Sequence, residues 1–299
     1  MESNISVIIP TKNRKESLLR CLHSVFSQTL KPFEVIVVDD GSTINTSEFV
    51  LTKFPQTKLI TNINSHGGAV ARNQGATAAE GDYIAFIDSD DEWLSDHLAG
   101  KLDVLNRSNA DGVFGTFYLL KGEEEEEIVF EKNISRNRNI GNAILDIKRF
   151  DARTSTFLFR KEAFNNIRFD ENLKKHQDWD LAINFDNQYK FVLDETPSVK
   201  IYVEQGEDRM SQKLQHKSSF YFIDKNSKHI EANNIFMFCL KQIMRSQLAK
   251  ESKEIIDKYI IVAEPYFKKL SIRNKILFSL LKNRLLNIGK VYNLRSKIK

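Results

Sequence analysis

Cysteine, glycine, proline and long apolar runs are all scarce in this 299-residue chain, and each scarcity excludes a class of protein. Two cysteines, Cys21 and Cys239, support neither a disulfide framework nor a zinc cluster, so a reducing compartment is expected. Twelve glycines and five prolines are too few for extended linkers. No apolar run approaches the roughly 18 residues of a membrane span, and the N-terminus lacks a secretory signal. The sequence therefore predicts a folded, cytoplasmic protein.

Acidic residues are missing from the last part of the chain. Residues 265–299 hold ten Lys or Arg and no Asp or Glu, so the preceding residues carry 34 basic against 40 acidic side chains. The basic residues are not interleaved with stacking aromatics, which argues against a nucleic-acid partner. A stripe at helical spacing predicts a cationic amphipathic helix, formed by Leu277, Leu281, Leu285, Ile288 and Tyr292. Such a helix either packs on the protein or lies on an anionic membrane surface, and both alternatives stay open.

Short apolar runs alternate with helical periodicity in the first third of the chain. Strands are predicted over residues 5–11, 33–42, 58–63 and 82–90, with helices in between, one of them over about 69–79. This alternation predicts an α/β fold with a mostly parallel central sheet flanked by helices.

The rest of the chain is less regular. Residues 111–120 alternate like a strand, and residues 123–130 are expected to lead through a hairpin tip or loop into another strand. The Glu run itself is interpreted as a solvated turn. Residues 153–164 resemble a strand passing into a helix, and another helix is predicted over 178–185. From about residue 212 onward, helical patterns dominate.

Polar side chains follow several of the predicted strands. Pro10 and Thr11 follow the first strand, Asp39 and Asp40 end the second, and three aspartates in FIDSDD end the fourth. In parallel sheets, ligands bind outside the carboxyl ends of the strands, so these residues are expected to share one edge. The Asp40 carboxylate could accept hydrogen bonds from a nucleobase or ribose, or could serve an ordinary turn.

The crowding of Asp88, Asp90 and Asp91 is unfavourable unless a cation, water or a proton relieves it. Carboxylates at alternate positions offer hard oxygen ligands to Mg²⁺ or Mn²⁺, with open positions left for phosphate oxygens. In HGGAVARNQG (66–75), Gly67 permits close approach of a ligand to the backbone, and Arg72 could pair with a phosphate. The glycines lack the spacing of the dinucleotide fingerprint.

Five stretches together resemble glycosyltransferase family 2: SVIIPTKNR, SVFSQTL, FEVIVVDDGS, GGAVARNQG and GDYIAFIDSDDEW, in the family's order over the first hundred residues. The resemblance implies a Rossmann-like GT-A fold over residues 1–211, with a nucleotide-binding half (about 1–110) and an acceptor half (about 111–211). A helical, basic C-terminal region (212–299) follows. It also implies that Pro10, Thr11 and Asp40 contact the nucleoside.

The same resemblance implies that the acidic loop, residues 88–91, binds the donor. Asp88, with Ser89 beside it, would contact the ribose or the metal, and Asp90 would hold the Mn²⁺ or Mg²⁺ that bridges the diphosphate. QGEDRMS (205–211) resembles a flexible loop that closes over the diphosphate, with Arg209 as its anion contact, although a plain surface loop is an alternative.

KHQDWDLAIN (175–184) resembles the family's Glu-Asp-Trp-Asp segment, whose second residue is the catalytic base of inverting members. Asp178 occupies that position, and Gln177 departs from the usual Glu. Asp180 lies about 200° around a helix from Asp178, so the two cannot point equally into one cleft. Asp178 is therefore the predicted base.

The implied function is an inverting glycosyltransferase of surface polysaccharide synthesis. It would move a sugar from a nucleotide donor, a UDP-sugar in the commonest case, to a saccharide or lipid-linked saccharide at the inner face of the membrane. A degenerate, non-catalytic sugar-nucleotide-binding protein is one alternative. A metal-dependent phosphatase or nucleotidyltransferase is another, but its expected signals after the first strand are replaced by PTKNR.

Overall fold

The computed structural model describes residues 4–122, 124–128, 139–145, 151–203, 214–290 and 292. The chain forms two compact units. The described residues of 1–140 and 151–207 make up the first unit, and those of 141–150 and 208–299 the second. The domain boundary predicted at residue 211 lies outside the described residues and stays a prediction.

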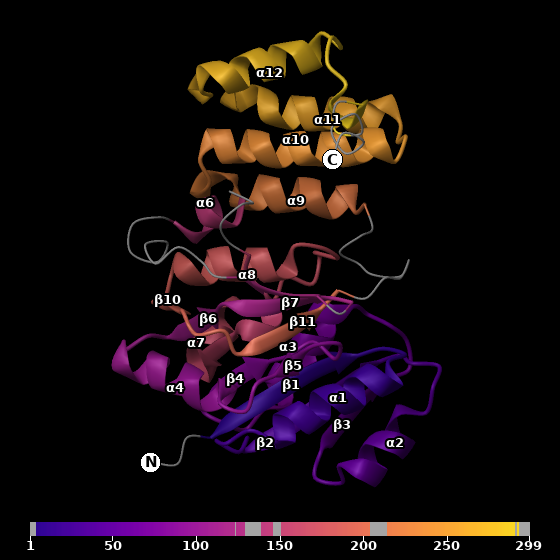
Figure 1. The fold of residues 1–299 in the computed structure, drawn as a ribbon, viewed down its shortest axis with the longest axis vertical. Helices are drawn as coiled ribbons and strands as arrows, with labels where there is room; N and C mark the ends of the chain where they lie inside the picture. The colour runs from indigo at the N-terminus through magenta and orange to yellow at the C-terminus, as the bar shows by residue number, and fades with distance from the viewer. Residues whose placement is uncertain are drawn as a thin grey trace. The chain divides into compact units, whose positions relative to one another are not determined.

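A seven-stranded sheet forms the centre of the first unit, in the order β10-β6-β9-β4-β1-β2-β3 (Figure 1). Neighbouring strands are parallel, except that β9 runs antiparallel to both β4 and β6. The strands are β1 (Ile5–Thr11), β2 (Glu34–Asp40), β3 (Lys58–Asn62), β4 (Tyr83–Phe86), β6 (Gly112–Gly115), β9 (Leu158–Arg160) and β10 (Phe191–Asp194). The mostly parallel sheet of the predicted α/β fold is confirmed.

Helices connect these strands in the predicted alternation. They are α1 (Lys15–Phe26), α2 (Thr46–Lys53), α3 (Gly68–Ala78), α4 (His97–Arg107), α7 (Lys161–Ile167) and α8 (Gln177–Asp186). The fourth strand, predicted over 82–90, ends earlier, at Phe86. Because a buried strand offers no solvation to carboxylates, the aspartates lie in the loop that follows it.

A smaller sheet has the order β5-β11-β7-β8, with β5 (Glu92–Trp93), β7 (Phe117–Lys121), β8 (Glu124–Ile128) and β11 (Val199–Tyr202). The single strand predicted over 111–120 is wrong, because the chain leaves one sheet for the other at Thr116. The Thr116 N–H donates to the Asp194 carbonyl (3.3 Å), and its hydroxyl donates to the Glu195 carbonyl (3.1 Å).

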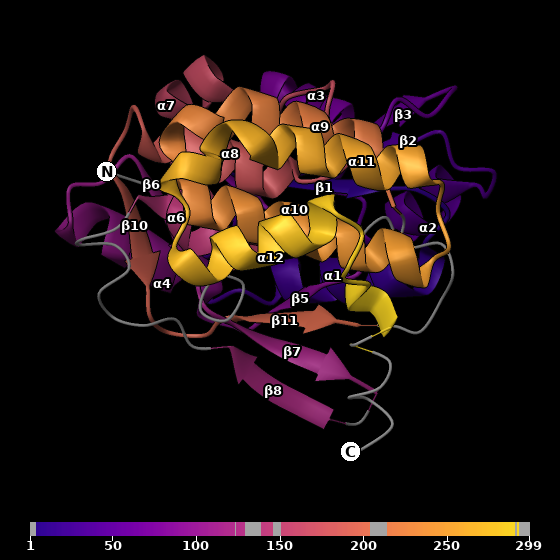
Figure 2. The ribbon, with the colours of Figure 1, turned by 90° about the horizontal axis from the view of Figure 1, so that it is seen from above.

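The hairpin that the sequence predicts over 123–130 is confirmed, but the interpretation of its Glu run as a solvated turn is wrong. Part of it forms β8, which pairs antiparallel with β7 at the edge of the small sheet (Figure 2). Glu126 and Lys121 form an ion pair across the two strands, at 2.9 Å. Charged side chains are common on edge strands because they discourage pairing with another chain.

Phenylalanine rings fill the core between the central sheet and helices α7 and α8. Neighbouring ring centroids lie between 4.6 and 6.3 Å apart, and the cluster comprises Phe86, Phe114, Phe157, Phe159, Phe164, Phe169, Phe185 and Phe191. Such rings each bury roughly 150 Å² or more and pack with preferred tilts. The cluster therefore fixes α8 against the end of β4, where the acidic loop begins.

The second unit is helical, as predicted. Its helices are α9 (His216–Asn226), α10 (Ala232–Leu248), α11 (Lys253–Ala263) and α12 (Ile272–Lys282), with most of α6 (Ile140–Leu145) and the short turns η2 (Ser227–His229) and η3 (Glu264–Lys269). Phe278 of α12 contacts the rings of Phe236 and Phe267. Each helix in the described part of the chain is too short or too polar to traverse a bilayer.

The single amphipathic helix predicted over 277–292 is wrong, because α12 ends at Lys282. Arg284 adopts a left-handed backbone (φ 58°), and the Leu285 N–H donates to the Leu280 carbonyl at 2.8 Å. This hydrogen-bond pattern closes a helix at its C-terminus. The stripe is divided accordingly: Leu281 is buried, whereas Leu285 is 75% exposed.

Candidate active site

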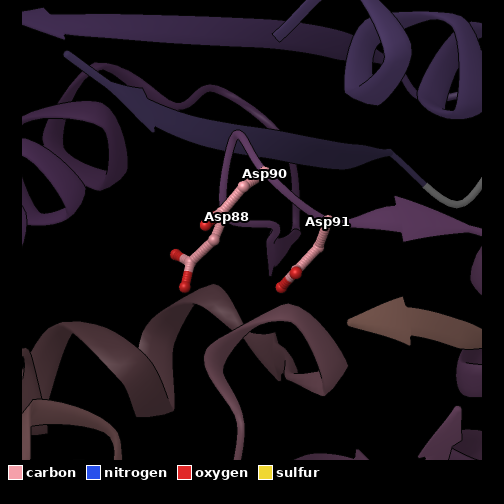
Figure 3. Close-up of side chains that lie close together, drawn as sticks. All are labelled: Asp88, Asp90 and Asp91. Atoms are coloured by element: carbon pink, nitrogen blue, oxygen red, sulfur yellow. The ribbon is translucent and has the colours of Figure 1, made fainter. Parts of the chain in front are cut away.

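Three carboxylates gather in the loop between β4 and β5. Asp88, Asp90 and Asp91 each offer one oxygen, and these oxygens lie within 4.8 Å of one another (Figure 3). Ser155, in the turn η1 (Thr154–Thr156), secures the loop: its hydroxyl accepts from the Asp88 N–H (3.0 Å) and donates to the Asp91 carboxylate (2.5 Å). The strand end therefore presents a cluster of hard oxygen ligands.

Arginines of the same chain balance much of this charge. Arg72 Nη2 lies 2.5 Å from Asp88 Oδ1, and Arg14 forms an ion pair with Asp90. Burial raises the pKa of Asp91 well above its usual value, and the charges of Asp90 and Asp88 raise it further. The crowding noted in the sequence is thus relieved by two guanidinium groups and a carboxyl that retains its proton more readily.

A divalent cation nevertheless fits the donor set. Mg²⁺ binds oxygen ligands at about 2.0 to 2.1 Å, so oxygens on opposite sides of an ion are separated by roughly 4 Å. The spread of at most 4.8 Å among Asp88, Asp90 and Asp91 is compatible with that geometry. The three oxygens could hold Mg²⁺ or Mn²⁺ if Arg14 left Asp90.

Asp40, at the end of β2, anchors the glycine turn before α3. Its carboxylate accepts from the Ser65 hydroxyl (2.7 Å) and from the N–H groups of His66 and Gly67 (both 2.8 Å). Burial raises the pKa of Asp40, but these bonds outweigh burial and lower it. Gly67 has φ of 102°, a conformation that favours glycine. The predicted nucleoside contact of Asp40 stays a prediction.

The predicted residues of β1 lie beside this anchor. The register of β1 and β2 pairs Pro10 with Val38 and Thr11 with Asp39. Within the described residues, the buried Thr11 hydroxyl has no hydrogen-bond partner. Ser89 is buried in the acidic loop. The structure thus places Pro10, Thr11, Asp40 and Ser89 at strand ends or in the loops after them, as the sequence predicted.

Arg72 links the acidic loop to helix α8. Its Nη2 contacts Asp88, and its Nη1 donates to Gln177 Oε1 at 2.9 Å. Gln177 in turn donates from Nε2 to the Leu173 carbonyl at 2.6 Å, and this bond orients its oxygen toward Arg72. Gln177, noticed in the sequence as a departure from Glu, therefore has a defined partner.

Asp178 is the second residue of α8 and is half-buried. Its Oδ1 accepts from the Trp179 N–H at 3.0 Å. Burial raises the pKa of Asp178 to about 6, and Arg153 partly opposes this shift. Asp180 is only 1% exposed, so Asp178 is the more accessible of the two helix aspartates. A half-buried carboxylate of this pKa can accept a proton near neutral pH.

Two residues near Asp178, Arg153 and Asp151, cannot be recognised as site residues from the sequence. Arg153 Nη2 pairs with Asp151 Oδ2 at 2.6 Å, and Trp179 Nε1 donates to Asp151 Oδ1 at 3.0 Å. No local pattern distinguishes Arg153 or Asp151, because both lie in an irregular segment distant in sequence from α8, which holds Asp178 and Trp179. Arg14 lies within the PTKNR stretch, but the sequence indicates no role for it. Arg209 lies outside the described residues.

The fold and this arrangement define a class of protein. Residues 1–349 of Staphylococcus aureus TarS, solved in complex with UDP-GlcNAc, superpose with a TM-score of 0.68 over 94% of this chain and 87% of that chain, at 20% sequence identity. The chain therefore has the GT-A fold.

The family follows from the sequence comparison. The model described as Glycosyl transferase family 2 matches residues 6–168, more than half of the chain, and the protein belongs to this family. The amylovoran biosynthesis glycosyltransferase AmsB of Erwinia amylovora is 27% identical over 79% of this chain and 81% of its own length. The poly(ribitol-phosphate) beta-N-acetylglucosaminyltransferase TarP of S. aureus is 31% identical over 60% of this chain and 57% of its own. The protein is a glycosyltransferase.

Proposed function

We propose that the protein transfers a sugar from a UDP-sugar to a hydroxyl of a saccharide or lipid-linked saccharide, with inversion at the anomeric carbon, in surface polysaccharide synthesis. AmsB is named for amylovoran biosynthesis. An Escherichia coli relative, 30% identical over 46% of this chain, is named a UDP-Glc:alpha-D-GlcNAc-diphosphoundecaprenol beta-1,3-glucosyltransferase. These names support a sugar-nucleotide donor and a lipid-linked or polymeric acceptor.

One observation carries the proposal: Arg72 contacts Asp88 of the acidic loop and also Gln177, the neighbour of Asp178. A single buried guanidinium therefore joins the predicted donor site to the predicted base. In this proposal Pro10, Thr11 and Asp40 contact the nucleoside. The turn at Gly67 admits the diphosphate, which Arg72 binds, and Asp88 and Ser89 contact the ribose side.

Asp90, with Asp88 and Asp91 beside it, would hold Mn²⁺ or Mg²⁺. When bound, such an ion neutralises negative charge on a departing diphosphate. The residues around it have separate tasks. Arg72 supplies a fixed positive charge for the phosphates, and Ser155 keeps the loop in place through its bonds to Asp88 and Asp91.

Asp178 would accept the proton of the acceptor hydroxyl, on the face of the sugar opposite the diphosphate. A pKa of about 6 leaves roughly ten ionised carboxylates for each protonated one at pH 7. Proton transfer to a positioned base contributes about 100- to 10,000-fold to a rate. Displacement from the opposite face inverts the anomeric configuration.

Thermal stabilisation by a panel of sugar nucleotides, each with Mn²⁺, identifies the donor, because a ligand of the native state raises its melting temperature. Hydrolysis of that donor without an acceptor then tests activity. We expect slow release of UDP, which Asp178→Asn abolishes and the exposed control Asp103→Asn leaves unchanged. Donor binding without hydrolysis or transfer would support the degenerate, non-catalytic alternative instead.

An exposed face of the second unit suggests where the protein binds its acceptor. Ile272 and Ile276, one turn apart on α12, are 79% and 56% exposed, and Arg273 lies exposed between them. The other face of α12, with Phe278 and Leu281, is buried. We propose that the exposed face touches the anionic inner surface of the membrane, since apolar and cationic side chains together favour such surfaces.

Sedimentation with vesicles tests this contact. Ile272→Ser/Ile276→Ser should weaken binding to vesicles containing anionic phosphatidylglycerol, and neutral vesicles should bind neither protein. Exchange of Ser279, an exposed residue of the same helix, for Ala is the control. Equal binding of the double variant and the unaltered protein would exclude α12 as the contact.

A further inference from the structure

Asp90 has two arginine partners at the start of α1 and within it, and they contact different parts of Asp90. Arg14, directly before α1, forms its ion pair with the carboxylate. Arg20, within α1, donates from Nη2 to the main-chain carbonyl at 2.9 Å and lies 3.9 Å above the ring of Tyr202. Arg20 therefore helps to fix the backbone of Asp90, whereas Arg14 occupies the oxygens that a cation would use.

The partners of the three aspartates differ in how firmly they are held. The side chain of Arg72 is 11% exposed, and Gln177 and the ring of Phe169 also contact it. Asp91 is bound to the buried Ser155. Arg14 is 37% exposed and lies outside the first helical turn, with φ of −133° and ψ of 76°. Of these partners, Arg14 is the most exposed to solvent, which can hydrate a guanidinium that leaves its carboxylate.

A guanidinium and a divalent cation compete for the same carboxylate oxygens and repel each other at short range. A cation bound at Asp90 therefore requires Arg14 to move. A diphosphate arriving beside Asp90 would offer the displaced guanidinium another anion, and arginine pairs well with phosphate oxygens. Cation binding and diphosphate binding are then linked through one side chain.

We propose that Arg14 is a displaceable counter-ion of Asp90, which yields the carboxylate to a divalent cation and then pairs with the diphosphate of the donor. The inference rests on the proposed nucleotide-sugar site. It predicts that the cation binds weakly alone and more tightly together with a nucleoside diphosphate. By linkage, the cation increases diphosphate affinity by the same factor.

Electron paramagnetic resonance of Mn²⁺, titrated into the full chain with and without UDP, measures this linkage. Arg14→Met, which keeps an apolar stem, should tighten Mn²⁺ binding without UDP by about three- to tenfold, because one competitor and one repulsive charge are removed. The factor by which UDP tightens Mn²⁺ binding should shrink in the same variant. An unchanged far-ultraviolet circular dichroism spectrum would confirm that the variant is folded.

Arg20→Met is the matched control, since it removes the same charge from the same helix without releasing the carboxylate. It should tighten Mn²⁺ binding without UDP clearly less than Arg14→Met does, because it removes a repulsive charge but no competitor for the carboxylate. The inference is overturned if Arg14→Met binds Mn²⁺ no more tightly than the unaltered protein, or if Arg20→Met tightens binding equally. Absence of Mn²⁺ binding in all proteins, with and without UDP, would also overturn it. Sugar transfer measured in the presence of a metal chelator would then test the proposed function separately.

Discussion

Two carboxylates, Asp40 at the end of β2 and Asp178 at the start of α8, have pKa values shifted in opposite directions. Asp40 is 5% exposed, yet its pKa is lowered because, against the effect of burial, it accepts hydrogen bonds from the turn at Gly67. Asp178 is less buried, yet burial raises its pKa to about 6, with one bond from the Trp179 N–H opposing the shift. Several hydrogen bonds to the charged form thus lower the pKa of the anchor, whereas burial dominates at the proton acceptor.

The largest expected effect is on catalysis. Asp178→Asn should lower kcat by about 100- to 10,000-fold, because the acceptor hydroxyl loses its base, while calorimetric affinity for UDP changes less than about threefold. Asp90→Asn should weaken both donor binding in Mn²⁺ and turnover. Equal loss of UDP affinity in the two variants would contradict this division of roles.

The next effect is on stability. Asp40→Asn should lower the free energy of unfolding by about 1 to 3 kcal/mol at pH 7, because an amide nitrogen would then face N–H donors. Urea unfolding measures the loss, with Asp103→Asn as the exposed control. Since the folded-state pKa of Asp40 is lowered, its contribution is present above the unfolded-state pKa and is lost as pH falls through the folded-state value. The difference in the free energy of unfolding between Asp40→Asn and the unaltered protein should therefore become smaller in acid. A difference that does not change with pH would exclude a role for the negative charge of Asp40.

A smaller effect is expected on the pH profile. The acidic limb of kcat/KM should fall tenfold per pH unit below about pH 6, as Asp178 is protonated. Because Arg153 lowers this pKa, Arg153→Met should move the limb to higher pH, measured with donor and acceptor well below saturation. Arg107→Met, which removes an exposed arginine, is the control. If the acidic limb does not move in Arg153→Met, Arg153 does not influence the pKa of Asp178.

The sequence predicted what local pattern determines. Runs of Ile and Val identified β1 and β2, and turn residues after them located Thr11 and Asp40 at the sheet edge. Contacts between distant residues carried no such signal. Arg72 reaches the acidic loop from α3, Arg14 from the position directly before α1, and Ser155 from a turn more than sixty residues away.

Errors in the predicted elements have the same origin. The break at Thr116 depends on hydrogen bonds to residues 194 and 195, and the Glu run forms a strand because β7 offers a partner edge. The end of α12 depends on a left-handed residue, Arg284, which no glycine announces in the sequence. Periodicity alone cannot detect these features, since each depends on tertiary contacts or on an uncommon backbone conformation.

The proposed reaction is a direct displacement at the anomeric carbon, assisted by a base on the face opposite the diphosphate. Proton nuclear magnetic resonance of donor hydrolysis without an acceptor tests it, because the first-formed sugar can be observed before its anomers equilibrate. From an α-linked UDP-sugar, the proposed displacement predicts that the β-anomer appears first. Initial formation of the α-anomer would contradict it.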